Sequence, residues 1–287
     1  MRDYVIVTDS ATDLAPAMAA DLGLHTIQLE VIVDGCAPTL NDQLDTKAFY
    51  AELRSKKGAT TSAVNIDRFL TEFEAVLQKD VDILYLGFSS GLSSTFQSGR
   101  LALEELSEKY PDRKLYAVDT LCASMGQGLL VYHAVQRKQA GASIEEVRDF
   151  VEQNKLNLCH WFTVDDLFFL KRGGRVSAAS AVVGTMLSIK PVLHVDNAGK
   201  LINVAKVRGR KAAVDALFDK MKASVLPDVN PVIFISHGDC DSDAQYLANR
   251  IRNELGYEHI EISFVGPVIG AHSGPGTLAL FFLGGER

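Results

Sequence analysis

Residues 83–106, ILYLGFSSGLSSTFQSGRLALEEL, contain a complete strand, loop and helix. The apolar run from Ile83 to Phe88 has the length and β-rich composition of a buried strand. Serines follow it, and apolar residues then recur at helical spacing from about Ser94 to Leu106. Because repeated units of this type build sheets with parallel strands, the stretch predicts an α/β fold.

The same order recurs on both sides of this unit. Further strands are expected at residues 4–8, 27–33 and 115–118, and further helices from 13 to 22, at 66–77 and from about 124. The alternation predicts an N-terminal domain, residues 1–155, with a mostly parallel sheet and helices on both faces.

The second half has a different pattern, because strand-like segments come closer together after a helix at 144–154. The runs 191–195 and 201–207 flank Asn197-Ala-Gly199, which predicts a hairpin. Other strands are expected at 158–163, 232–236 and 258–264, with a helix at 244–255. These features predict a second α/β domain, residues 156–287, whose sheet is mixed and partly antiparallel. A chain of 287 residues is also long enough to split into two cores.

Composition limits the partners that the chain can bind. The formal net charge is −7 and the pI ≈ 5.5, which argue against nucleic acid or an anionic membrane surface as a partner. The four cysteines are far apart and form no C-x-x-C pair, so neither a zinc site nor a disulfide framework is expected, and a reducing cytoplasm fits best. The sequence also contains no secretory leader and no apolar run long enough to span a membrane.

Hydroxyl groups gather where the expected strands end. They occur at Thr8-Asp9-Ser10, Thr60-Thr61-Ser62, Ser89–Thr95 and Asp119-Thr120. In an α/β sheet such positions form ligand sites, and Ser93 or Ser94 would also cap the following helix. An acidic protein can still bind one local anion through such donors and a helix N-terminus.

The loop after residue 86 also supports an enzymatic hypothesis. Residues 87–91, G-F-S-S-G, match the G-x-S-x-G nucleophile elbow of α/β hydrolases. Ser89 would then be the nucleophile, with Asp119 or Asp166 and His272 completing a triad. Against this hypothesis, several residues intervene between the serine and the helix, whereas an elbow turns directly into its helix.

Four further segments complete the candidates: two basic, one glycine-rich, and one that contains possible metal ligands. Residues 165–177 join an apolar helix to a K-R-G-G-R exit, which favours a helix C-cap over a phosphate cradle. Residues 206–211, K-V-R-G-R-K, could dock an anionic partner. His272 lies in the glycine-rich stretch 266–276 and could present a ring nitrogen to an anion. Residues 237–243 contain His, Asp and Cys, but their spacing fits no structural zinc pattern, so a turn and helix cap are expected there.

Taken together, these segments resemble the DegV family of bacterial fatty-acid-binding proteins. The resemblance runs almost from end to end of the chain. It rests on V-T-D-S at 7–10, T-T-S at 60–62, S-S-G-L-S-S-T-F-Q-S at 89–98, D-T-L-C-A-S-M-G-Q-G at 119–128, D-L-F-F-L-K-R-G-G-R-V-S at 166–177, I-K-P-V-L at 189–193, K-V-R-G-R at 206–210 and G-A-H-S-G-P-G at 270–276. Three positions depart from the family pattern: no proline follows Thr61-Ser62, Ser94 replaces a glycine, and Asp119 is followed by threonine instead of serine.

The resemblance implies a long-chain fatty acid bound in a tunnel between the two domains, with no cofactor, no metal and no catalytic residue. It places the carboxylate at Thr61, Ser62, Ser93, Ser94 and His272. Tunnel candidates in apolar stretches near the domain interface are Phe168, Phe169, Met186, Leu187 and Ile189. Several family members are similar to the lipid-carrying subunit of a fatty acid kinase, which implies an ATP-binding kinase subunit as partner, with Arg172, Lys206, Arg208 and Arg210 as contact candidates. A lipid-sensing regulatory module remains a further alternative.

Overall fold

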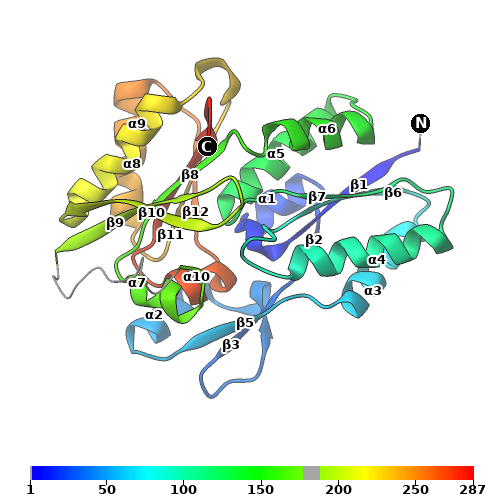
Figure 1. Cartoon of the computed structure of the whole chain (residues 1–287), viewed down its shortest axis with the longest axis horizontal. Coiled ribbons are helices and arrows are strands. Elements are labelled where there is room, and N and C mark those ends of the chain that lie inside the picture. The colour runs from blue at the N-terminus through cyan, green and yellow to red at the C-terminus, as the bar shows by residue number, and fades with distance from the viewer. Residues whose placement is uncertain (1, 177–187) are drawn as a thin grey trace.

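The computed structural model describes residues 2–176 and 188–287, and its elements form layers (Figure 1). In the first sheet the strand order is β2-β1-β6-β7, and every neighbouring pair is parallel. These strands are β1 (Tyr4–Asp9), β2 (His25–Ile27), β6 (Asp82–Gly87) and β7 (Leu115–Asp119). The parallel sheet predicted for the first half of the chain is therefore confirmed.

Helices cover both faces of this sheet because its strands are apolar on both sides. In β6, Ile83 and Tyr85 pack with α3 (Ile66–Leu77) and α4 (Thr95–Lys109). Leu84 and Leu86 point the other way and pack with the helices of the opposite face. Those helices are α1 (Pro16–Asp21), α5 (Met125–Gln139) and α6 (Ile144–Asn154).

The second large sheet is mixed, as predicted, with the strand order β10-β9-β8-β13-β11-β12. Strands β11 and β12 are parallel and the other neighbours are antiparallel. The strands are β8 (Leu158–Thr163), β9 (Ile189–Val195), β10 (Leu201–Arg208), β11 (Ile233–His237), β12 (Ile260–Phe264) and β13 (Leu278–Leu283). The predicted hairpin is β9–β10.

Helix α5 lies between the two large sheets. In β13, Ala279 and Phe281 pack in the same core as α5, whereas Leu280 and Phe282 face the opposite side. That outer face is covered by α8 (Arg210–Ser224) and α9 (Asp241–Leu255) (Figure 1). A single core thus joins one face of the parallel sheet to the inner face of the mixed sheet.

The third sheet is small and antiparallel. Its order is β4-β3-β5, with β3 (Glu30–Val33), β4 (Thr39–Leu40) and β5 (Ala59–Ser62). Three short helices gather near it: α2 (Thr46–Arg54), α7 (Leu167–Arg172) and α10 (Pro267–Ser273) (Figure 1). Helix α10 contacts β3, β5 and α7, so a late segment of the chain covers an early sheet.

Several elements differ from the sequence predictions. The single strand expected at 27–33 is two strands in different sheets, because the N–H of Leu29 donates to Ser10 Oγ at 2.9 Å between them. Residues 60–62 belong to β5 and do not follow a strand. The predicted boundary near residue 155 separates the two large sheets along the chain and otherwise remains a prediction. Among the helices of the described residues, none combines the length and apolar composition that crossing a bilayer requires.

Candidate functional site

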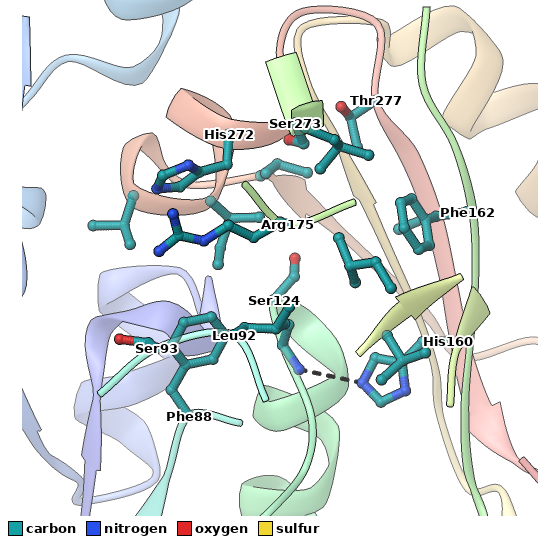
Figure 2. A pocket seen from close by; sticks show the side chains of 18 of the residues that line it. Phe88, Leu92, Ser93, Ser124, His160, Phe162, Arg175, His272, Ser273 and Thr277 are labelled. Carbon is teal, nitrogen blue, oxygen red and sulfur yellow. Dashed lines mark hydrogen bonds between the residues drawn. The ribbon is translucent and has the colours of Figure 1, made fainter. Parts of the chain in front are cut away.

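A cavity of about 290 Å³ lies where the three sheets meet (Figure 2). It is bordered by β5, the loop after β6, α10, and the inner face of the mixed sheet. Most of its wall is hydrocarbon, from Leu29, Phe88, Leu92, Phe162, Leu170, Val195, Leu201, Val265, Val268, Ile269, Ala279 and Phe281. An apolar molecule therefore fits most of this space.

Thr61 and His272 meet on one side of the cavity. The hydroxyl of Thr61, on β5, lies 2.8 Å from Nε2 of His272, on α10. Burial, together with the nearby cations Arg175 and Arg172, lowers the pKa of His272 to about 4, so the imidazole is neutral at pH 7. A Cβ on Gly173 would lie 2.4 Å from Nδ1, so the glycine makes room for the ring. The pair can bond an anion without bringing a charge of its own.

Residues 88–94 between β6 and α4, here called the serine loop, supply more hydroxyls to the same cavity. Ser93 Oγ accepts from the N–H of Thr95 at 3.2 Å, at the start of α4. Ser94 also lines the cavity, and its side chain makes no capping bond to α4. Its φ of −77° is ordinary helical backbone, so serine fits without strain where the family pattern has glycine. The N-terminus of this 15-residue helix adds a partial positive charge beside both hydroxyls.

Arg175 was not assigned from the sequence. It follows α7, is half-buried, and bonds to the carbonyl of Gly173. Among the described lining residues it is the one permanently charged side chain. Figure 2 shows it next to His272. Burial lowers the pKa of its guanidinium, which means that an anion at this end would offset the desolvation of the charge. The K-R-G-G-R motif showed a basic segment, but the sequence could not show which cation turns inward.

Other predicted site residues lie elsewhere. Ser62 points away from the cavity, because neighbouring residues of a strand face opposite sides, and it lines a separate small hollow. Phe168 is 58% exposed, and Phe169 packs against Gly274. Neither phenylalanine lines the cavity, and Ile189 at the start of β9 does not line it either. The predictions for Met186 and Leu187 fall outside the described residues.

The hydrolase hypothesis finds no support in the geometry. Ser89 is fully buried, and its hydroxyl donates to the carbonyl of Gly199 at 2.8 Å. His272 is bonded to Thr61, Asp119 accepts from backbone N–H groups, and Asp166 caps α7. The proposed triad is not assembled. Within residues 2–176 and 188–287, no group of His, Cys, Asp and Glu side chains is placed to hold a metal ion.

The predicted partner contacts divide into two groups. Arg172 is exposed on α7, and Lys206 and Arg208 are exposed on β10, an edge strand of the mixed sheet. Arg210 is half-buried and pairs with Asp243 at 2.8 Å, with Asp165 3.6 Å away. Arg210 thus ties α8 to its neighbours, whereas the first three cations are accessible.

The amino-acid sequence matches a known protein family. A family model described as "Uncharacterised protein, DegV family" matches residues 3–284. The chain belongs to the DegV family. A DegV domain-containing protein of Clostridium perfringens is 47% identical over 100% of this chain and 99% of its own length. A DegV domain-containing protein of Lactococcus lactis is 37% identical over 97% of this chain and 96% of its own length.

Solved DegV structures share the whole fold. A DegV lipid-binding protein of Thermotoga maritima superposes with a TM-score of 0.86 at 29% identity, covering 99% of both chains. A fatty-acid-binding DegV protein of Thermus thermophilus also gives a TM-score of 0.86 at 29% identity, covering 98% and 99% of the two chains. DegV of Bacillus subtilis, a fatty acid binding protein, gives a TM-score of 0.84 at 27% identity, covering 98% of this chain and 99% of its own. Fatty acid binding is thus a property of DegV relatives with this architecture.

Proposed function

We propose that this protein binds a long-chain fatty acid in the cavity between its sheets. The observation that carries the proposal is the distribution of polarity in the cavity, where a mostly hydrocarbon wall adjoins one side whose described residues include one cation, hydroxyls and a neutral imidazole. An amphiphile with one anionic group matches that distribution. Fatty acid binding by the DegV relatives supports the same ligand class.

The carboxylate lies among Thr61, Ser93, Ser94, His272 and Arg175 in this proposal. Thr61 and Ser93 donate hydroxyl hydrogens, and Arg175 supplies the compensating charge. The neutral state of His272 keeps a second positive charge out of the apolar cavity. Charge-assisted hydrogen bonds of this type offset the desolvation of the head group.

The hydrocarbon chain then lies along Phe88, Leu92, Phe162 and Phe281. Each methylene that leaves water contributes about 0.8 kcal/mol, so a chain of ten or more buried methylenes outweighs the cost of desolvating one well-bonded carboxylate. Short acids lack this contribution. The affinity is therefore expected to rise steeply with chain length until the cavity is filled.

Extraction tests this proposal directly. The purified protein is extracted with organic solvent, and the extract is analysed by mass spectrometry for long-chain acids in stoichiometric amount. The delipidated protein is then titrated calorimetrically with palmitate and with octanoate. We expect recovery of a long-chain acid and much tighter binding of palmitate; an empty extract together with no heat of palmitate binding would refute the proposal.

Presentation of the bound acid to a kinase is the second part of the proposal. Three accessible cations, Arg172, Lys206 and Arg208, stand out on a chain of net charge −7, which supports an acidic partner surface. The ATP-binding subunit of a bacterial fatty acid kinase is the partner to test. We expect acyl phosphate only when both proteins, ATP and the acid are present.

Charge reversal separates the partner surface from the lipid site. Lys206→Glu with Arg208→Glu is expected to keep palmitate binding and lose phosphorylation by the kinase subunit. Lys79→Glu with Lys222→Glu, a matched double change at exposed lysines after α3 and near the end of α8, controls for net charge. Equal phosphorylation of both variants would exclude the β10 edge as the docking surface. Unimpaired lipid binding with no phosphorylation by any kinase subunit would favour a sensor instead.

A further inference from the structure

The cavity wall contains polar groups beyond those that face the proposed carboxylate. Ser124, His160, Ser273 and Thr277 all line it. Figure 2 shows Ser124 at the start of α5, Ser273 on the other side of the cavity, and His160 beside Phe162 on the mixed sheet. A purely hydrocarbon ligand would cover these groups without bonding them, so their existing partners decide what the wall can accept.

Two of the four are satisfied within the fold. Thr277 Oγ1 donates to the carbonyl of Gly274 at 2.8 Å. His160 is held by both ring nitrogens, since Nδ1 lies 3.0 Å from the carbonyl of Leu158 and Nε2 accepts from the N–H of Ala123 at 3.3 Å. Burial lowers the pKa of this histidine well below its ordinary value, so it is a neutral, fully used group. Thr277 and His160 therefore need no hydrogen bond from a ligand.

The hydroxyl of Ser124 has partners for some of its hydrogen bonds. Its hydroxyl donates to Asp13 Oδ2 at 2.5 Å and lies 3.0 Å from Ser236 Oγ, which can donate to it. A hydroxyl has one hydrogen and two acceptor sites. After these two bonds, Ser124 Oγ therefore keeps one acceptor site free beside the cavity.

Ser273 is the exception. It is 5% exposed, and its hydroxyl makes no hydrogen bond with any described residue. The side chain stands on α10 directly after His272, and it lines the same cavity. A buried hydroxyl without a partner is costly in a folded protein, and most buried hydroxyls have one. A serine hydroxyl rotates easily about the Cα–Cβ and Cβ–Oγ bonds, so it can form a hydrogen bond with a polar atom in the cavity.

We propose that the preferred ligand is an oxygenated fatty acid, with a hydroxyl group on its chain that bonds to Ser273. This inference rests on the proposed function and narrows its ligand class. The chain hydroxyl accepts from or donates to Ser273 Oγ, and the free acceptor site of Ser124 offers a second partner. An unsubstituted acid would displace water from Ser273 and leave the serine unbonded, whereas a hydroxy acid replaces the lost bond.

A binding series tests the inference. Delipidated protein is titrated with stearate and with a set of hydroxystearates that carry the hydroxyl at successive carbons. We expect at least one isomer to bind roughly tenfold more tightly than stearate, the factor that one net hydrogen bond provides. If stearate binds tightly and every hydroxystearate binds equally or less tightly, the inference is overturned while the proposed function stands. If neither stearate nor any hydroxystearate binds, the proposed function itself fails.

Variants assign the effect to the serine. Ser273→Ala is expected to lose the roughly tenfold preference and to bind stearate as the natural protein does, which also reports that it folds. Ser62→Ala, a serine that faces away from the cavity, is expected to keep the preference. Retention of the full preference by Ser273→Ala would overturn the assignment of the chain hydroxyl to Ser273.

Discussion

Thr61 and Ser62 carry the same functional group one residue apart, yet only one of them reaches the cavity. In β5 the Thr61 side chain points to α10 and bonds His272, whereas Ser62 faces the other side of the strand. The sequence motif T-T-S could not distinguish them, because the segment was not identified as a strand and the alternation of its side chains was therefore not applied.

Thr61→Val tests this geometry. Valine keeps the branched shape of threonine and removes the hydroxyl, so the bond to His272 and one donor to the carboxylate are lost. We expect the affinity for palmitate to fall about tenfold or more, as measured by calorimetry, with an unchanged circular dichroism spectrum. Ser62→Ala is the matched control and should bind palmitate normally; a larger loss in Ser62→Ala than in Thr61→Val would contradict the placement.

Asp13 is a buried carboxyl that determines a pH dependence of stability. It accepts from Ser124 Oγ, and burial raises its pKa to about 7. In the unfolded chain an aspartate titrates near pH 3.9. Between these values the folded state binds more protons than the unfolded state, so the free energy of unfolding falls as the pH rises from about 4 to about 7.

Asp13→Asn should remove that part of the pH dependence. Asparagine tolerates the left-handed backbone at this position, where φ is 53°, and its carbonyl can still accept from Ser124. In urea unfolding from pH 4 to pH 7, we expect the free energy of unfolding of the natural protein to fall by a few kcal/mol more than that of the variant. Parallel stability curves would show that the carboxyl is already ionised at low pH.

At the scale of elements, the serine loop and the β9–β10 hairpin hold each other across the two large sheets. The Ser89 hydroxyl donates to the carbonyl of Gly199, and Gly91 lies against the carbonyl of Ala198. Gly199 has a φ of +70°, and a Cβ there would lie 2.1 Å from Ser89 Oγ. This contact keeps the loop that bears Ser93 in position.

Gly199→Ala should therefore cost about 3 kcal/mol of unfolding free energy, from backbone strain together with overpacking. In a Ser89→Ala background, the overpacking part should be recovered, because the atom that Cβ meets has been removed. Gly141 has a φ of +94°, and a Cβ there would meet no atom of the described residues within 4 Å, so Gly141→Ala reports the strain alone. Additive effects of Gly199→Ala and Ser89→Ala in chemical unfolding would argue against a direct contact.

Elements with strong local signals were predictable, and those that depend on distant partners were not. Helix α6 and strand β8 were predicted at their observed bounds from periodicity and strand-forming residues. Helix α10 was missed, because its glycines and proline are typical of turns. It forms where it packs on the small sheet and on α2, and Gly270 lies so close to Tyr50 of α2 that a Cβ would be 2.6 Å from the phenol oxygen. Strand β13 was missed because a short apolar run between glycines does not by itself distinguish a strand from other buried segments.

The candidate site was predictable to the same degree. Ser93, Ser94 and His272 were found from polar clusters and glycine spacing, and the structure places all three along one cavity with Thr61. Arg175 and the wall residue Phe162 were not found. Their roles depend on how the mixed sheet and α7 pack against the serine loop. That packing cannot be predicted from a local sequence pattern.

At the scale of the whole molecule, one hydrophobic core joins the two large sheets through α5. Leu84 of the parallel sheet and Phe281 of the mixed sheet belong to the same cluster of buried residues. Because neither sheet can separate without exposing that cluster, we expect a single cooperative transition on heating, despite the two-domain organisation predicted from sequence.

A bound fatty acid should raise the temperature of the whole unfolding transition. Palmitate at 100 times its dissociation constant is expected to stabilise the folded protein by about 2.7 kcal/mol and to move the entire transition upward in scanning calorimetry. Octanoate at the same concentration should have little effect. A shift confined to one of two resolved transitions would indicate that the ligand contacts only one half of the chain.

The proposed function depends on where the acid lies, and a crystal structure with a bromine-labelled fatty acid locates it directly. With bromine at the far end of the chain, we expect carboxylate oxygens within hydrogen-bonding distance of Thr61 and Ser93, and one anomalous peak inside the apolar wall near Phe162 and Phe281. A peak outside that cavity, or a carboxylate far from Arg175 and His272, would contradict it.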